Sequence, residues 1–197
     1  MNPLLLDIPT EFSSERLDLR RYRPEDSAVY FQMLQANQDH LREFLPPLLE
    51  AVGNEADAKD VLRKLTAEWQ PRNLFIFGVW EKGSNSYVGE VYLANPNWQV
   101  PCIELGYFLI KDKTGHGYAT EAAQAAIKFA FEQLNVVRVE LQCAADNAAS
   151  QRVAERCGFT LEGRQRQRQR KKDGSLADRL WYGLLLSEWQ NANKNNP

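Results

Sequence analysis

The chain has 197 residues, of which 25% are charged and 44% apolar, and its formal net charge is −2. This balance is typical of a globular protein with a sizeable core and excludes collagen-like and strongly disordered chains. No apolar run approaches the roughly 18 residues that span a bilayer, and the N-terminus lacks the basic start and apolar length of a signal peptide. We therefore expect one domain over residues 1–197 in the cytoplasm, with loose tails at 1–13 and 190–197.

The first third of the chain predicts a strand, two helices and a loop between them. Residues 15–22 alternate polar side chains with leucines, as a half-buried strand does. Pro24 and the two acids after it open a helix that ends near Asn37. The proline-limited segment 40–47 could be either a wall of a substrate site or a plug of the core. A second amphipathic helix spans residues 55–70.

The middle of the chain predicts a sheet with one crossover. Residues 73–81 and 87–93 form an antiparallel hairpin, and residues 102–110 form the next strand. A helix that begins near Gly117 leads to a strand at 136–143. These last two strands should be parallel, because an antiparallel neighbour would not need so long a connection.

The last quarter of the chain predicts a short helix and a hairpin. The helix follows Asn147 and stops at Gly158, and residues 159–170 and 180–186 form the closing hairpin. Residues 164–170 alternate four arginines with three glutamines, so neither face of that strand resembles core. This strand is either a solvated hairpin or a basic wall that steers an acidic acceptor or contacts RNA. The arginines lack interleaved aromatic side chains, so the base-stacking surface of a single-strand binder is missing.

Cysteines and histidines give no sign of a disulfide framework or a metal site. Cys102, Cys143 and Cys157 show no C-x-x-C spacing, so we expect each to be a small core residue. His40 and His116 are not accompanied by acidic residues at ligand spacing, so no catalytic metal is expected.

A glycine turn, Gly115-His116-Gly117, joins the predicted strand at 102–110 to the helix after it. Glycine lets backbone approach a ligand closely, and the first turn of a helix leaves N–H groups unpaired. Such a turn binds phosphate well, although two glycines between a strand and a helix also occur without any ligand. The turn alone leaves both interpretations open.

One carboxylate stands out in the strand before this turn. Alternation places Glu104 on the same face as Gly106 and Phe108. A carboxylate within an apolar strand is costly to bury without a partner. Glu104 could pair with an arginine at the strand end, or it could act as a general base, directly or through a water.

Asn147 and Ser150 lie three residues apart at the start of the short helix, so their side chains point to the same side. Asn147 is a typical helix N-cap. The helix start lies near the C-terminal ends of the two parallel strands, where α/β units usually bind ligands. The structural and the functional interpretation are compatible.

Two of these motifs resemble those of the GNAT acyltransferases. The sequence TGHGYA at residues 114–119 resembles the motif that binds the acetyl-CoA pyrophosphate. The spacing of Asn147, Ser150 and Val153 before Gly158 resembles the second motif of the superfamily.

Further matches narrow the resemblance to ribosomal-protein N-terminal acetyltransferases, the Rim-type subgroup. They are the sequence SERLDLR at residues 14–20, ELGY at 104–107, and Gly174 with Asp178 before Glu188-Trp189. The similarity spans roughly residues 14–189. It implies an α+β (α/β/α) fold, with about four helices and a mixed, mostly antiparallel sheet in which one parallel strand pair splays apart.

The resemblance also implies a set of site residues, with acetyl-CoA as cosubstrate and no metal. The cofactor-binding residues would be Thr114, Gly115, His116, Gly117, Tyr118 and Ala119 at the pyrophosphate, Phe108, Leu109 and Ile110 along the pantetheine arm, and Asn147. Thr114 stands where the family usually carries Gln or Arg. The tyrosine that many members use as general acid is absent, and in the subgroup Ser150 takes that role. The catalytic residues would then be Glu104, Ser150 and Asn147.

The expected activity is N-acetyltransfer from acetyl-CoA to a primary amine by direct attack. At pH 7 an α-amino group costs only about 1–1.4 kcal/mol to deprotonate, whereas a lysine costs roughly 4.6 kcal/mol. This favours a protein or peptide N-terminus, such as that of a ribosomal protein, as the acceptor.

Two alternatives stay open. The acceptor could be a polyamine or an aminoglycoside, bound by an acidic pocket to which Glu43, Glu50, Glu55 and Asp57 contribute. Alternatively, the chain could be a non-catalytic nucleic-acid-binding module on the same fold. We expect a monomer or homodimer that contacts neither membrane nor nucleic acid directly.

Overall fold

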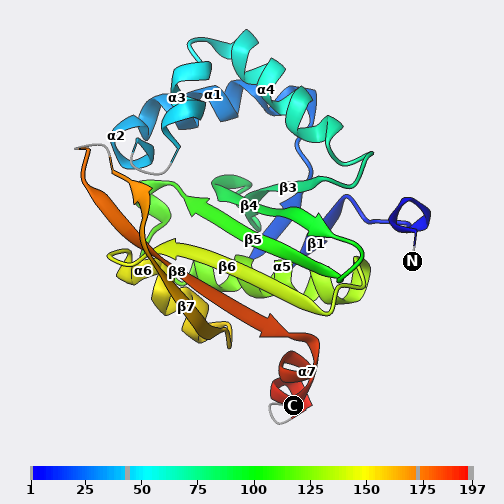
Figure 1. The fold of residues 1–197 in the computed structure, drawn as a ribbon. Coiled ribbons are helices and arrows are strands. Elements are labelled where there is room, and N and C mark those ends of the chain that lie inside the picture. The colour runs from blue at the N-terminus through cyan, green and yellow to red at the C-terminus, as the bar shows by residue number, and fades with distance from the viewer. Residues whose placement is uncertain (1, 43–44, 172–173, 195–197) are drawn as a thin grey trace.

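A single twisted sheet forms the centre of the protein (Figure 1). The computed structural model describes residues 2–42, 45–171 and 174–194. Within these ranges eight strands pair in the order β1-β2-β3-β4-β5-β6-β8-β7. Their bounds are β1 Glu11–Ser13, β2 Leu17–Arg20, β3 Leu74–Glu81, β4 Ser86–Asn97, β5 Cys102–Leu109, β6 Arg138–Ala144, β7 Thr160–Arg170 and β8 Leu176–Leu185.

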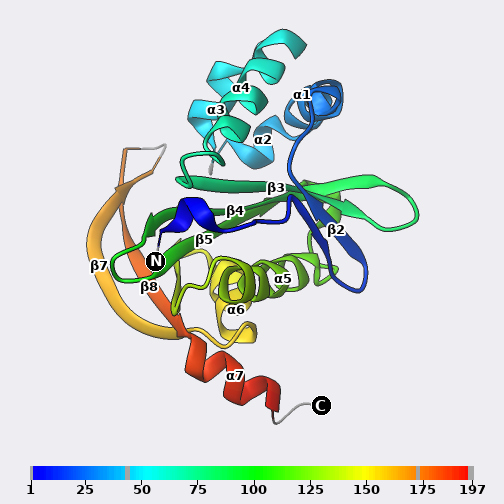
Figure 2. The same ribbon diagram turned by 90° about the vertical axis from the view of Figure 1, so that its right-hand side faces the viewer.

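Helices cover both faces of this sheet (Figures 1 and 2). One face carries α1 Ser27–Ala36, α2 Gln38–Leu41, α3 Pro46–Ala51 and α4 Glu55–Ala67. The other face carries α5 Tyr118–Gln133 and α6 Ala148–Arg156, and α7 Leu186–Lys194 continues from the end of β8. The described part holds no helix that is long and apolar enough to cross a membrane.

The predicted fold class is confirmed, with differences in the short elements. The sheet is mixed and mostly antiparallel, and β5 and β6 form its parallel pair. The described ranges contain seven α-helices rather than about four, because α2, α3 and α7 lie in segments predicted to be loop or tail. α3 begins at Pro46, since proline suits the first turn of a helix. The predicted tails likewise contain β1 and most of α7.

The parallel pair β5–β6 is short, and the two strands then separate. Their ladder runs from Cys102 opposite Arg138 to Leu105 opposite Leu141. Beyond this point β5 continues to Leu109 beside β4, while β6 continues to Ala144 beside β8. Each strand keeps its outer partner, so a splay opens between them in the middle of the sheet.

Small side chains let α5 lie close against the sheet below this splay. Ala122, Ala126 and Ala130 are fully buried and recur at helical spacing on the face that meets β4 and β5. Phe77 of β3 packs edge-on against Phe129 of the same helix, with ring centroids 5.1 Å apart. The position of the start of α5 is therefore set by packing along its whole length.

A buried carboxylate lies under the helices of the opposite face. Glu90 on β4 is 5% exposed and accepts a hydrogen bond of 2.8 Å from the Tyr22 hydroxyl. That hydroxyl lies 2.7 Å from the hydroxyl of Tyr87. Tyr30 is also buried nearby, and its hydroxyl has no hydrogen-bond partner among the described residues. Burial raises the pKa of Glu90 to about 8.

This raised pKa predicts a stability that falls with pH. Between about pH 4.5 and 8 the folded state holds one proton more than the unfolded state, so its advantage is complete below pH 4.5 and is lost as pH rises to 8. The upper bound of that loss is about 4–5 kcal/mol. Glu90→Gln should flatten the dependence, measured as the free energy of unfolding in urea at pH 6 and pH 8.5.

Glu132→Gln, at an exposed position of α5, is the matched control and should leave the wild-type slope unchanged. If Glu90→Gln retains the full wild-type pH slope, Glu90 is ionised in the folded protein at both pH values and this account is wrong.

Candidate functional site

A groove of about 1640 Å³ opens at the splay between β5 and β6. Tyr92, Gly106 and Phe108 form its floor on the face that carries α1 to α4. One wall comes from α2, α3 and the segment between them, and the other from β8 and the end of β7. Through the splay the groove reaches the start of α6, where Asn147 and Ser150 line it.

The splay leaves one edge of β5 without a strand partner. The Ile110 N–H donates to the Val88 carbonyl at 3.1 Å, so position 110 faces β4. Hydrogen-bonded pairs alternate along an antiparallel ladder, which turns the backbone of Phe108 toward β4 as well. The backbone groups of Tyr107 and Leu109 therefore face the splay.

This geometry bears on the predicted pantetheine contacts, which remain a prediction. Phe108 and Ile110 have their backbone groups engaged within the sheet, and of the three predicted residues only Leu109 faces the splay. Tyr107 is the second open position. The Leu109 carbonyl already lies 3.1 Å from Nε2 of His40, which α2 brings to the mouth of the splay.

The glycine turn lies directly before α5. Gly115 and Gly117 both have φ of +82°, a left-handed conformation that other residues rarely adopt. Gly117 is the N-cap of α5 and supplies no side-chain hydrogen bond, so the first N–H groups of the helix point outward. Gly115 has open space where a Cβ would lie. Thr114 closes the preceding turn through its hydroxyl, which donates to the Lys111 carbonyl at 2.8 Å.

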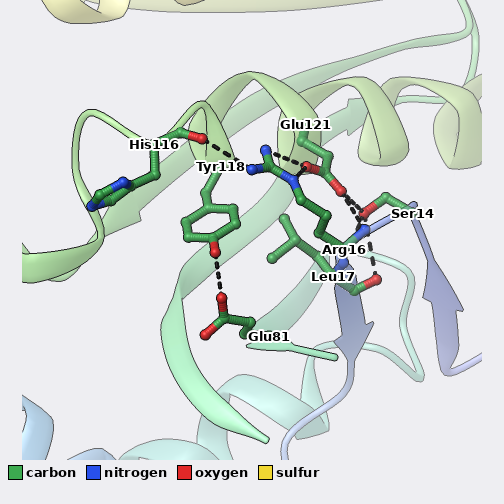
Figure 3. A network of polar contacts seen from close by, with 7 residues as sticks. All are labelled: Ser14, Arg16, Leu17, Glu81, His116, Tyr118 and Glu121. Atoms are coloured by element: carbon green, nitrogen blue, oxygen red, sulfur yellow. Dashed lines mark hydrogen bonds and ion pairs between the residues drawn. The ribbon is translucent and has the colours of Figure 1, made fainter. Parts of the chain in front are cut away.

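Arg16 ties this turn to the N-terminal part of the chain (Figure 3). Its Nη1 donates to the His116 carbonyl at 3.2 Å, and its Nε donates to Glu121 at 2.7 Å. The Arg16 backbone N–H and the Ser14 hydroxyl also donate to Glu121, at 2.7 and 2.6 Å. The Glu121 carboxylate, in the first turn of α5, thus accepts its hydrogen bonds from Ser14 and Arg16. The N–H groups of the glycine turn are left for another partner.

Tyr118 lies beside Arg16 and links the same turn to β3 (Figure 3). The guanidinium of Arg16 lies over its ring, 4.6 Å from the centroid, and its hydroxyl donates to Glu81 at the end of β3. Lys113 pairs with Glu81 at 2.7 Å. Hydrogen bonds from Lys113 and then from Tyr118 lower the pKa of Glu81 to about 2. The glycine turn is thus fixed on both flanks by charged contacts.

Asn147 and Ser150 occupy the start of α6 as predicted. The Asn147 side chain accepts from the Ser150 backbone N–H at 3.0 Å, which is an N-cap contact. The Ser150 hydroxyl lies 3.0 Å from the hydroxyl of Tyr107. Burial raises the pKa of Tyr107, so this hydroxyl keeps its proton at any working pH. The sequence pattern did not single out Tyr107, and its contact with Ser150 was missed.

Glu104 is not among the residues that line the groove, although it is adjacent to them on β5. It is half-buried and precedes Leu105, where the groove lining on β5 begins. Its carboxylate accepts a hydrogen bond of 3.0 Å from the Asn95 side chain rather than from an arginine. Asn95 has φ of +52° and sits at an irregularity of β4, between the strands predicted at 87–93 and 102–110.

The basic strand β7 is interrupted by a bulge. Its register against β8 shifts between Gln165 and Gln169, and Gln167 adopts φ of +53°. Asp178 of β8 holds the bulge by accepting from the Gln167 N–H at 2.8 Å and from Arg164 at 2.7 Å. Beyond the bulge Gln169 and Arg170 line the groove, so the end of this strand belongs to the site.

The sequence matches the acetyltransferase (GNAT) domain family over residues 16–160. It is 28% identical over 180 residues to "Putative ribosomal N-acetyltransferase YdaF" of Bacillus subtilis, which covers 90% of this chain and 95% of that protein.

Two solved structures share the fold. One is the ribosomal-protein-S5-alanine acetyltransferase of Vibrio fischeri, with a TM-score of 0.82 at 21% identity over 92% of this chain and 99% of that one. The other is RimL, a ribosomal L7/L12 α-N-protein acetyltransferase in complex with coenzyme A, with a TM-score of 0.80 at 21% identity over 92% and 98%. The family match covers well over half of the sequence, and the chain therefore belongs to the GNAT family of acetyltransferases.

Proposed function

We propose that this enzyme transfers the acetyl group of acetyl-CoA to the N-terminal α-amino group of a protein or peptide. The observation that carries the proposal is the groove at the β5–β6 splay. It joins the open edge of β5 and the start of α6 to a large surface between α2, α3 and the β7–β8 hairpin. An extended chain end fits such a groove, and an acetyl donor fits the splay.

The donor side of the site fits coenzyme A. The N–H groups of the turn and of the first residues of α5 suit a pyrophosphate, since a helix N-terminus carries about half a positive charge. The backbone groups of Tyr107 and the N–H of Leu109 suit an extended arm that pairs with the freed edge as a strand would. When bound, acetyl-CoA supplies an activated thioester.

The residues of this chain would orient the amine and move its protons. Glu104 precedes the first groove-lining residue of β5 and is the proposed base, acting through a water, for an amine whose proton is easily lost. The Ser150 hydroxyl is the proposed proton donor to the departing thiolate. Tyr107 holds that hydroxyl at 3.0 Å and so fixes its direction. Asn147 contributes by capping the helix that presents Ser150.

A small polycationic acceptor is the second candidate, and acidic side chains in the groove would favour it. Of the four acids considered from sequence, Glu50 lines the groove. Asp57 accepts from the backbone N–H of Asn54, the N-cap of α4, and Glu55 accepts from the Ser27 hydroxyl, whereas Glu43 lies outside the described residues. Asp39 joins Glu50, but Arg42, Arg170 and Arg179 line the same groove. We therefore rank a polyamine below a peptide N-terminus as the acceptor.

The function is tested by thiol release from acetyl-CoA over a panel of acceptors. Peptides with different first residues should be acetylated at the α-amino group, identified by mass spectrometry, in preference to spermidine and an aminoglycoside. Faster turnover of the polycations would favour the second candidate. If isothermal titration shows no binding of coenzyme A, the proposed donor is wrong.

Removal of Arg16 should weaken donor binding without removing any group that would touch the donor. Arg16→Ala frees the His116 carbonyl and Glu121, so the turn loses its fixed geometry. We expect the Kd of coenzyme A to rise about tenfold, as for the loss of a charged hydrogen bond. Arg23→Ala is the control, because Arg23 makes an exposed ion pair with Glu11. An unchanged Kd in Arg16→Ala would show that the turn holds its shape alone.

Glu104 and Glu90 lie on the same face of the sheet, and substituting each in turn tests which of them acts as the base. Glu104→Gln should lower kcat/KM for a peptide by about 10²-fold or more, a usual contribution of general base catalysis. Glu90→Gln changes a buried carboxylate on the neighbouring strand and should leave kcat/KM near the wild-type value. The opposite ranking of the two variants in the thiol-release assay would move the base to Glu90.

The contact between Ser150 and Tyr107 predicts non-additive kinetics. Ser150→Ala should lower kcat about tenfold or more with little change in coenzyme A affinity. Tyr107→Phe should lower kcat less, and it should have no further effect in the Ser150→Ala background, because it acts through that hydroxyl. Additive losses in the double variant would show that Tyr107 acts independently of Ser150.

A further inference from the structure

One arginine of the groove stands apart from the other half-buried arginines. Arg179 lies on β8, flanked by Ala144 of β6 and Gln165 of β7. Its neighbour Asp178 is occupied by the bulge of β7 on the other face of the sheet. Alternation therefore turns the Arg179 side chain toward the groove, and it lines that groove opposite α2 and α3.

Arg179 has no partner within the described ranges. Its Nε is buried and makes no hydrogen bond, and its guanidinium forms no ion pair there. By contrast, the half-buried Arg20 pairs with Asp26 at 2.7 Å, and Arg138 pairs with Glu140 at 2.8 Å. A partly buried charge without a counter-group is costly, which makes such a position unusual for a purely structural arginine.

The positive charge of Arg179 affects the pKa of two groups near the splay, Tyr92 and Cys143. Burial raises the pKa of the Tyr92 hydroxyl, and the nearby positive charge of Arg179 opposes that shift. Burial also raises the pKa of Cys143 on β6, and Arg179 opposes this shift too. The charge of Arg179 therefore acts on groups of both β4 and β6, the two strands that flank β5.

Resting on the proposed function, we infer that Arg179 is the specificity-determining residue of the acceptor groove. Its guanidinium binds an oxygen atom that lies beside the acceptor amine, either the carbonyl of a peptide or the carboxylate of a free amino acid. The fork of guanidinium donors suits such an oxygen. A simple alkylamine offers no such group, and a polyamine would bring further positive charge against Arg179.

The opposite wall completes this selection. Asp39 and Glu50 line the groove on α2 and α3, across from Arg179. A groove with acids on one wall and an arginine on the other complements a molecule that carries an amine and an oxygen acceptor together. This arrangement distinguishes α-amino compounds from amines that carry positive charge alone.

The test compares three acceptors that share the same amine-bearing carbon unit: an alanyl peptide, free alanine and ethylamine. In Arg179→Met, which keeps an apolar stem and removes the charge, kcat/KM should fall about 10- to 100-fold for the acceptor that supplies the oxygen, as for the loss of a charge-assisted hydrogen bond. The value for ethylamine should change less than threefold. For each acceptor, kcat/KM of Arg179→Met is divided by kcat/KM of the wild-type enzyme, so differences in pKa between the three amines cancel.

The two oxygen sources separate in the same experiment. A loss confined to the alanyl peptide identifies a peptide carbonyl, and a larger loss for alanine identifies a carboxylate. Arg168→Gln, which removes one positive charge from an exposed position of the same hairpin, should leave all three values unchanged. Coenzyme A affinity and the thermal unfolding midpoint serve as checks that Arg179→Met retains the fold and the donor site.

Several outcomes would overturn the inference. Wild-type kcat/KM of Arg179→Met on the peptide and on alanine would remove Arg179 from acceptor recognition. An equal loss on all three amines would show a general effect on the groove, and an equal loss in Arg168→Gln would show long-range steering by charge. If the wild-type enzyme binds coenzyme A and acetylates no α-amino compound, the proposed function itself fails, which is a different result.

Discussion

The site depends on the short length of the parallel hydrogen-bond ladder between β5 and β6. β5 and β6 pair only as far as Leu105 and Leu141, and each then follows its other neighbour. Backbone groups left open in the middle of a sheet are costly unless something pairs with them. Tyr107 and Leu109 are the positions so exposed, and the glycine turn, the start of α6 and the groove all lie around this opening.

The sheet also places the proposed functional side chains on two opposite faces. The alternation of β5 directs Glu104 toward the face that carries α1 to α4 and Tyr107 toward α6 and Ser150. On β8 the same alternation sends Asp178 to the bulge and Arg179 into the groove. One strand thus provides a proposed base on one side and the support of a proposed acid on the other. Proton removal and proton donation can then occur on opposite sides of a single strand.

Sequence patterns predicted the parts of this molecule that local rules control. Period and turn signals identified the strands other than β1, the crossover that makes β5 and β6 parallel, and the Asn147 N-cap. Short-range patterns could not identify contacts between distant residues, such as Arg16 with Glu121 or Tyr107 with Ser150. Nor could they show which backbone groups of β5 face the splay, since that depends on the register with β4. Asn95 was missed because a bulge within a long strand resembles a loop.

The tie between Arg16 and the glycine turn has a consequence for how the chain can be recombined. Arg16 and Glu121 are 105 positions apart, yet Arg16 and Ser14 both bind this residue in the first turn of α5. The segment between β1 and β2 and the start of α5 must therefore match each other. A chimera that takes its N-terminal segment from one relative and its crossover helix from another would separate them, even if both halves fold.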